Sequence, residues 1–140
     1  MSVPTYDQFI EPVLRFLAAR PNGATAAETQ EGAALALDLK SAQREETIAS
    51  GQATYKNRAG WAHDRLKRAG YSSSAKRGYW KLTEAGFAFA QSHPAPLSVE
   101  QVEYLAVNFM SVKLKPAPDA ASLDEGNDTP APIAQADLAT

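Results

Sequence analysis

The sequence predicts a mainly α-helical domain with one small β-hairpin, arranged as a winged helix-turn-helix. Three observations support this prediction. Residues 54–69 have the apolar spacing of a helix, residues 71–82 are typical of two short strands joined by a turn, and further helical segments precede and follow them. A helix followed directly by a hairpin is the order of the recognition helix and the wing in this fold.

The composition is that of one ordinary globular domain. With 140 residues, of which 44% are apolar, about 90 to 115 residues can share a single core, and the rest can form a linker or tail. The absence of cysteine excludes disulfides and thiolate metal sites, and we expect no cofactor. No apolar run approaches the roughly 20 residues of a membrane span. The N-terminus has no signal peptide pattern, so we expect a cytoplasmic protein without membrane contact.

The first helix is expected to begin near Thr5, because Thr5 to Gln8 has the form of a capping box. Pro12 lies inside this helix and removes one backbone hydrogen bond, which predicts a kink in the first two turns. Apolar residues recur at helical spacing and predict a buried face made of Tyr6, Phe9, Ile10, Val13, Leu14, Leu17 and Ala18.

Two further helical segments precede the basic helix. Thr25 to Glu28 forms a second capping box and opens an alanine-rich helix that runs to about Leu37. Ser41 is expected to cap a short helix that runs through Ile48.

The boundaries of the basic helix and the hairpin follow from local conformational preferences. Thr54 is expected to be the N-cap of the helix, and Gly70 is expected to end it in the left-handed conformation. Residues 72–77 are expected to turn, with Gly78 supplying a positive φ, and residues 79–82 to form the returning strand.

After the hairpin, Thr83 is expected to cap a helix that runs to about Gln91. A third capping box at Ser98 opens an amphipathic helix to about Leu114, which either docks on the domain or pairs with its copy in a homodimer, the latter being our preference. From Pro116 the chain has four prolines, five acids and no Lys or Arg, which predicts disorder. The expected parts are a winged-helix domain over 1–95, an amphipathic helix over 96–115 and an acidic, proline-rich tail over 116–140.

Basic charge is concentrated in the central stretch. Between Tyr55 and Lys81, eight basic residues stand against one acid, Asp64, for a net charge of +7. The whole chain carries −2, so the rest carries −9. This local surplus favours binding to a polyanion.

The expected DNA contacts lie on the basic helix and at the wing tip. On a helical wheel, a polar and basic face lies opposite the apolar one, and it predicts major-groove contacts by Lys56, Asn57, Lys67 and Arg68. Lys76 and Arg77 at the wing tip are expected on the neighbouring backbone or in the minor groove.

Four side chains have two interpretations each. Tyr79 and Trp80 alternate across a strand, so one belongs in the core and the other is a contact candidate, for which we take Trp80. Arg58 is a further contact candidate. However, Arg58 and Arg65 lie near the buried edge of the helix, where each could instead run along the core or pair with an acid such as Glu11.

Catalytic patterns are scarce. The two histidines, His63 and His93, have no metal-binding spacing, and the chain contains neither a nucleophile elbow nor a phosphate-binding glycine loop. We expect His63 to be an exposed polar residue. No metal site is expected.

Two stretches resemble the N-terminal domain of Mrr-type restriction proteins, which are type IV, modification-dependent restriction endonucleases. They are NRAGWAHDRLKRAG at residues 57–70 and KRGYWKLTEAG at residues 76–86, and an opening Pro4-Thr5-Tyr6 with an internal Pro12 supports them. The resemblance covers about residues 4–92. It implies a winged-helix module that recognises double-stranded DNA, often base-methylated, and that precedes a magnesium-dependent nuclease domain in the family.

The nuclease domain is not expected in this chain. Such a nuclease needs carboxylates that hold Mg²⁺ and a lysine that follows one of them by two residues, whereas the last lysine here is Lys115. The leading hypothesis is therefore a DNA-binding module of a restriction system without enzymatic activity of its own. The alternatives are a small transcription regulator that dimerises through residues 98–114 and a protein-interaction winged helix with an acidic partner.

Overall fold

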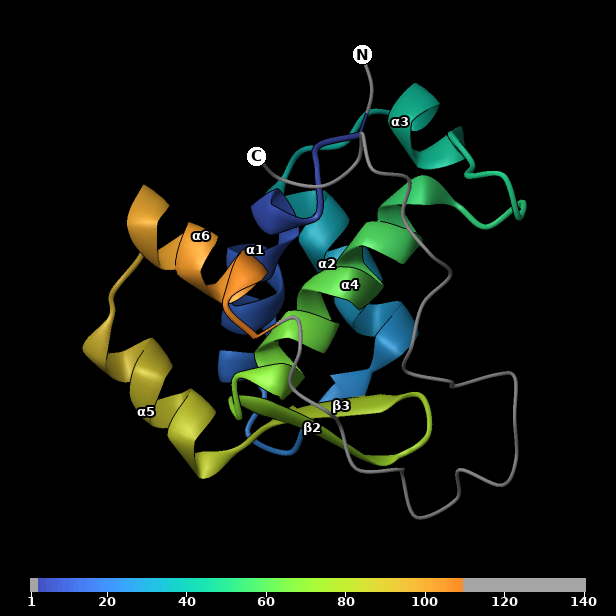
Figure 1. Ribbon diagram of the computed structural model, residues 1–140. Coiled ribbons are helices and arrows are strands. Elements are labelled where there is room, and N and C mark those ends of the chain that lie inside the picture. The colour runs from blue at the N-terminus through green and yellow to red at the C-terminus, as the bar shows by residue number, and fades with distance from the viewer. Residues whose placement is uncertain (1–2, 110–140) are drawn as a thin grey trace.

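In the computed structural model, which describes residues 3–109, three helices pack together above a small sheet (Figure 1). They are α1 (Asp7–Ala18), α2 (Ala26–Ala36) and α4 (Thr54–Arg68). The apolar face of α1 is buried as its spacing predicts, and it shares one core with Ala33 of α2 and with Ala59, Ala62 and Leu66 of α4. A short helix, α3 (Ser41–Glu45), lies between α2 and α4 in the chain.

The sheet has three antiparallel strands in the order β1-β3-β2. Its hairpin is β2 (Ser72–Lys76) and β3 (Tyr79–Leu82), and β1 (Ala24–Thr25) pairs with the other side of β3. The described elements confirm the predicted winged helix-turn-helix. The sequence did not reveal β1, because it has only two residues and Thr25 also caps α2.

Three of the predicted caps are present. Thr25 and Glu28 form the capping box of α2, Thr83 accepts from the Gly86 N–H at the start of α5 (Glu84–Ser92), and Ser98 and Gln101 form the capping box of α6 (Val99–Val107). Each cap satisfies backbone N–H groups that have no partner inside the helix.

Three predicted caps are wrong. α1 begins at Asp7, and Thr5 donates its hydroxyl to the Asp7 carboxylate instead of capping the helix. Ser41 is the first residue of α3, which ends at Glu45 rather than Ile48. Thr54 lies inside α4, whose N-cap is Ala53, and its buried hydroxyl has no hydrogen-bond partner.

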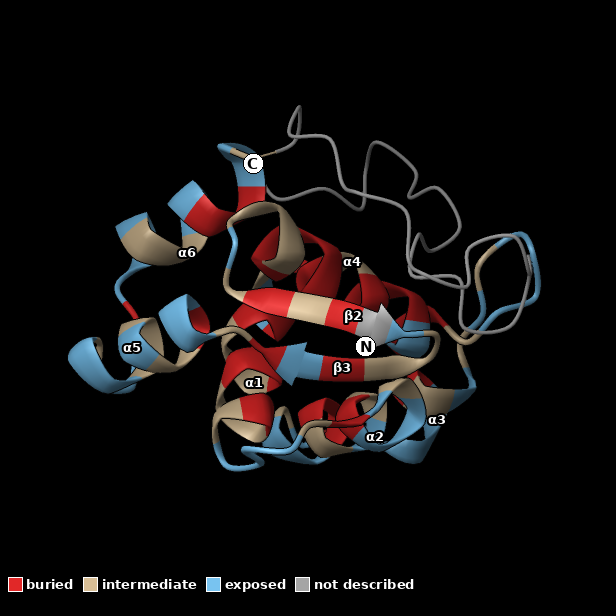
Figure 2. Ribbon diagram, turned by 90° about the horizontal axis from the view of Figure 1, so that it is seen from below, coloured by how far each residue is buried: buried red, intermediate tan, exposed pale blue. Residues whose placement is uncertain are grey.

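At one end of the molecule, α5 and α6 lie side by side (Figure 2). α6 docks on the domain: Leu105 and Ala106 are buried, and the Tyr6 hydroxyl of α1 donates to the Ala106 carbonyl at 2.7 Å. The helix ends at Val107 rather than near Leu114. The predicted disordered tail, residues 116–140, lies outside the described residues. Within residues 3–109, no helix is long and apolar enough to cross a membrane.

Candidate nucleic-acid interface

The basic helix α4 is connected to the wing by a sharply defined turn. Ala69 caps the helix, and Gly70 takes a φ of +86°, as predicted. The Tyr71 N–H donates to the Leu66 carbonyl at 2.9 Å and the Gly70 N–H to the Lys67 carbonyl at 2.9 Å. This pair of bonds is a Schellman motif, and it directs the chain from α4 into β2 through the three residues 69–71.

The tip of the wing is held against α2 and the turn that precedes β1. Its turn is shorter than predicted, because β2 occupies residues 72–76 and only Arg77 and Gly78 connect it to β3; Gly78 has the expected positive φ of 71°. At the tip, the Ala26 N–H of α2 donates to the Gly78 carbonyl at 2.9 Å. Nearby, the Tyr79 hydroxyl donates to the Asn22 carbonyl at 2.7 Å. The tip therefore has a defined position relative to α2.

Five of the eight predicted contact residues lie at least partly on the surface. Lys56 and Lys76 are exposed, and Lys67, Arg68 and Arg77 are half-buried. Lys56 and Lys67 are eleven residues apart on α4 and therefore lie on one side of the helix, about 16 Å apart along its axis. This is the side that carries His63, whose ring contacts the wing strand β3.

The other three predicted contact residues are buried, which corrects the expectation that they face a ligand. Trp80 is 3% exposed and stacks on His63, with 4.0 Å between ring centroids and 9° between ring planes. Of the pair Tyr79 and Trp80, Trp80 is thus the core residue. Arg58 is 6% exposed and donates to the carbonyls of Val3 and Pro4. Asn57 is 1% exposed, and its amide donates to Gln52 Oε1.

Arg65 also serves the core rather than the surface. It donates to the Ala106 carbonyl at 3.0 Å and to Asp64 Oδ2 at 2.5 Å. The alternative that it pairs with an acid is confirmed, but the partner is Asp64 and not Glu11, which forms its ion pair with Arg15. Asp64 Oδ2 accepts a second bond from Arg68 Nε at 2.7 Å. The one acid of the basic stretch therefore ties the half-buried Arg68 to the helix.

His63 is buried, with 0% of its surface exposed, so the expectation of an exposed histidine is wrong. Burial lowers the pKa of His63 well below its ordinary value of 6.5, and the positive charge of Lys67 lowers it further. The sequence signal that could have found it is position: His63 follows the core residues Ala59 and Ala62 at spacings of four and one.

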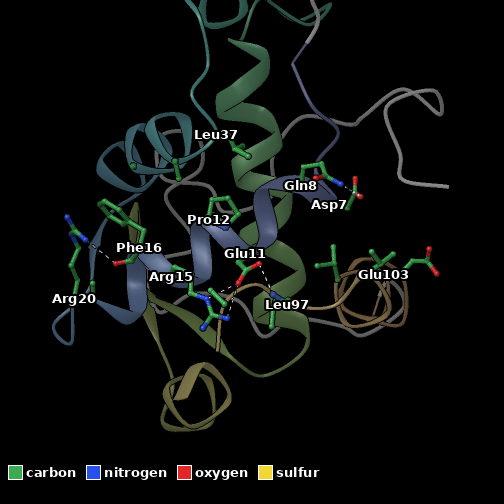
Figure 3. Close-up of a pocket in the computed structure, with 16 residues that line it drawn as sticks. Asp7, Gln8, Glu11, Pro12, Arg15, Phe16, Arg20, Leu37, Leu97 and Glu103 are labelled. Carbon is green, nitrogen blue, oxygen red and sulfur yellow. Dashed lines mark hydrogen bonds and ion pairs between the residues drawn. The ribbon is translucent and has the colours of Figure 1, made fainter. Parts of the chain in front are cut away.

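A hollow in the described part lies away from this surface and has no catalytic arrangement (Figure 3). It has a volume of about 820 Å³ and lies between α1, the end of α2 and the start of α6. In its wall, Arg15 pairs with Glu11 at 2.9 Å, and the Arg20 guanidinium lies 3.5 Å from the centre of the Phe16 ring. Within residues 3–109, no group of three or more His, Asp or Glu side chains could hold a metal ion.

The order of elements, the three-stranded sheet, the basic helix and the basic wing define a winged helix-turn-helix protein. A family model described as the Mrr N-terminal domain matches residues 6–92, and the chain belongs to this family. It is 58% identical over 130 residues to a type IV methyl-directed restriction enzyme, EcoKMrr, of Escherichia coli strain K12. That match covers 93% of this chain but 43% of the relative. No solved structure matches the chain significantly.

Proposed function

We propose that this chain is a DNA-recognition module of an Mrr-like restriction system, and that it binds double-stranded DNA with α4 and the wing. The observation that carries the proposal is the placement of basic side chains on two separate elements. Lys56 and Lys67 line the wing-facing side of α4, and Lys76 and Arg77 stand at the wing tip. Two elements that reach phosphates from one rigid frame can fix the register of a duplex.

The relative supports the choice of DNA over an acidic protein. The relative is a methyl-directed restriction enzyme, and the similarity includes the whole of the basic helix and wing. We therefore propose base-methylated DNA as the preferred ligand. Arg68 is the remaining candidate for reading a base edge. To do so, its guanidinium would exchange the Asp64 carboxylate for the acceptors of a guanine.

Charge removal at the proposed contacts tests this function. Alanine at Lys76 or Arg77 should weaken binding about equally for all duplex sequences, because these side chains meet only the backbone. Alanine at Arg68 should also change the base or methylation preference. Lys40→Ala is the matched control, since Lys40 is an exposed basic residue just before α3 that pairs with Asp38. Equal effects of Lys40 and Arg77 substitutions would show that binding depends on total charge and not on this surface.

A further inference from the structure

His63 joins α4 to both strands of the wing. Its ring stacks on Trp80 of β3, and its Nε2 lies 2.8 Å from Ser72 Oγ of β2. Ser72 Oγ in turn lies 3.1 Å from the Lys81 carbonyl of β3. One side chain of the helix thus contacts the base of the hairpin through a stack and a hydrogen-bond chain.

The direction of the hydrogen bonds from His63 through Ser72 to Lys81 follows from the acceptor at the end of the series. A carbonyl only accepts, so the Ser72 hydroxyl donates to Lys81 and is left to accept from His63 Nε2–H. The buried Nδ1 has no hydrogen-bond partner. The neutral tautomer with the proton on Nε2 satisfies this arrangement, and a second proton, on Nδ1, would make the ring cationic and place a donor in a dry site without an acceptor.

The bonds of Gly78 and Tyr79 hold the wing tip near α2, but the strand ladder of the hairpin is irregular, so the orientation of the wing relative to α4 also depends on the contacts of His63. β2 and β3 pair at Ser72 with Leu82 and at Ser73 with Lys81, and the register then shifts before Lys76 meets Tyr79. A shift of this kind interrupts the hydrogen-bond ladder and bends the strand. The ladder alone therefore does not fix the direction of the outer wing relative to α4.

We propose that His63 is a positioning residue: it sets the wing against α4 so that Arg77 and Lys76 reach the same duplex as Lys56. The inference rests on the proposed DNA binding. A buried apolar ring would supply the stack, but it would not supply the directional bond to Ser72. The groups that face His63 are Lys67 from α4, the Ser72 hydroxyl from β2 and the Trp80 indole from β3.

A double-mutant cycle tests the proposal. His63→Phe keeps a stacking ring and removes the donor, whereas His63→Gln keeps a donor. In the His63→Phe background, Arg77→Ala should change DNA affinity by less than about twofold, because the wing no longer meets the duplex; Lys56→Ala should keep its full effect. His63→Gln should restore the effect of Arg77→Ala. If Arg77→Ala weakens binding equally in the wild-type and His63→Phe backgrounds, the proposal is wrong.

Amide hydrogen exchange gives a readout that does not need DNA. His63→Phe should lower the protection of β2 and β3 amides while those of α1 and the core of α4 keep theirs. A uniform loss, or no loss, would mean that His63 only fills the core, and would overturn the proposal. If wild-type protein binds no DNA but the loss is confined to the wing, the DNA-binding function fails and the positioning role of His63 stands.

Discussion

At the scale of single residues, His63 makes stability depend on pH. Its pKa is lowered in the folded state, so between that value and 6.5 the unfolded chain binds more protons. The contribution of neutral His63 to the free energy of unfolding is then fully present above pH 6.5. It is lost as the pH falls, by at most about 1.4 kcal/mol per pH unit for one proton. Denaturant unfolding between pH 5 and 6.5 measures this slope.

His63→Gln provides the control for that measurement, since it should remove the slope. The lowered pKa values of Glu28 and Glu31 do not interfere, because carboxylates with an ordinary value of 4.5 lose their contribution at lower pH. A slope that persists unchanged in His63→Gln would assign the effect to other groups.

Gly86 is a second position where one residue decides local structure. A Cβ built there would lie 1.9 Å from the backbone oxygen of Tyr71, and backbone cannot move aside as a flexible side chain can. In an open helix, alanine is more favourable than glycine by about 1 kcal/mol. We expect the opposite sign for Gly86→Ala, a loss of about 1–3 kcal/mol from overpacking. Thermal unfolding beside Gln91→Ala, an exposed site on the same helix, measures it, and stabilisation would contradict the close approach.

Residue identity alone misplaced the polar side chains of α4. The wheel correctly located Ala59, Ala62 and Leu66 in the core, because apolar periodicity reports the buried face directly. Asn57, Arg58 and His63 are buried through specific acceptors: Gln52, the Val3 and Pro4 carbonyls, and Ser72. The carbonyls of Val3 and Pro4 come from a remote segment, Ser72 is the first residue of β2, and Gln52 lies in the loop just before the helix. The pattern of one helix contains no information about them.

At the scale of elements, α6 contributes to the fold of the domain. The Ala106 carbonyl accepts from Tyr6 and from Arg65, so α6 is fixed to α1 and α4 together. Leu105→Ala should cost about 2–5 kcal/mol, as for other buried leucines. Val99→Ala is the matched control, because Val99 is 76% exposed on the same helix. Equal melting temperatures for the two variants would contradict docking.

Pairing of α6 with its copy remains a separate prediction. Among the described residues of α6, Val99, Tyr104 and Val107 are large apolar side chains that are exposed. Solution mass by light scattering, with and without residues 97–140, tests the homodimer directly.

Elements with strong local signals could be predicted, and elements made by pairing could not. The capping boxes at Thr25 and Ser98 mark helix starts correctly, because they bond backbone N–H groups of the same segment. The glycines at 70 and 78 mark turns correctly, because both adopt a positive φ. β1 is invisible in the sequence because two residues carry no periodicity, and it exists only through its pairing with β3. The length of β2 was missed for a similar reason: serines favour turns locally, and strand pairing overrides that preference.

At the scale of the whole molecule, the overall fold and the basic stretch could be predicted from the sequence. Which of its basic side chains are exposed could not. Charge counting located the stretch, and burial then separates Lys56, Lys67, Lys76 and Arg77 from Arg58 and Arg65. Charge is a property of composition, but exposure depends on which carbonyls and acids the rest of the fold brings near.

We predict that this chain alone has no nuclease activity with Mg²⁺ or Mn²⁺ on plain or methylated DNA. A metal-dependent nuclease needs positioned carboxylates, and the described part has no cluster that could hold an ion. Incubation with supercoiled plasmid is the measurement. Metal-dependent nicking that survives substitution of both histidines, in a preparation of a single mass, would contradict the prediction.

The central claim is that α4 and the wing bind DNA through its phosphates. Fluorescence anisotropy of one labelled duplex, prepared unmethylated, adenine-methylated and cytosine-methylated and titrated at several salt concentrations, tests it most directly. With about five phosphates neutralised, log K should fall against log salt with a slope of roughly −4 to −5, and a methylated form should bind most tightly. Binding that is absent for all three duplexes, or that does not change with salt, would contradict the claim and favour a protein-interaction module instead.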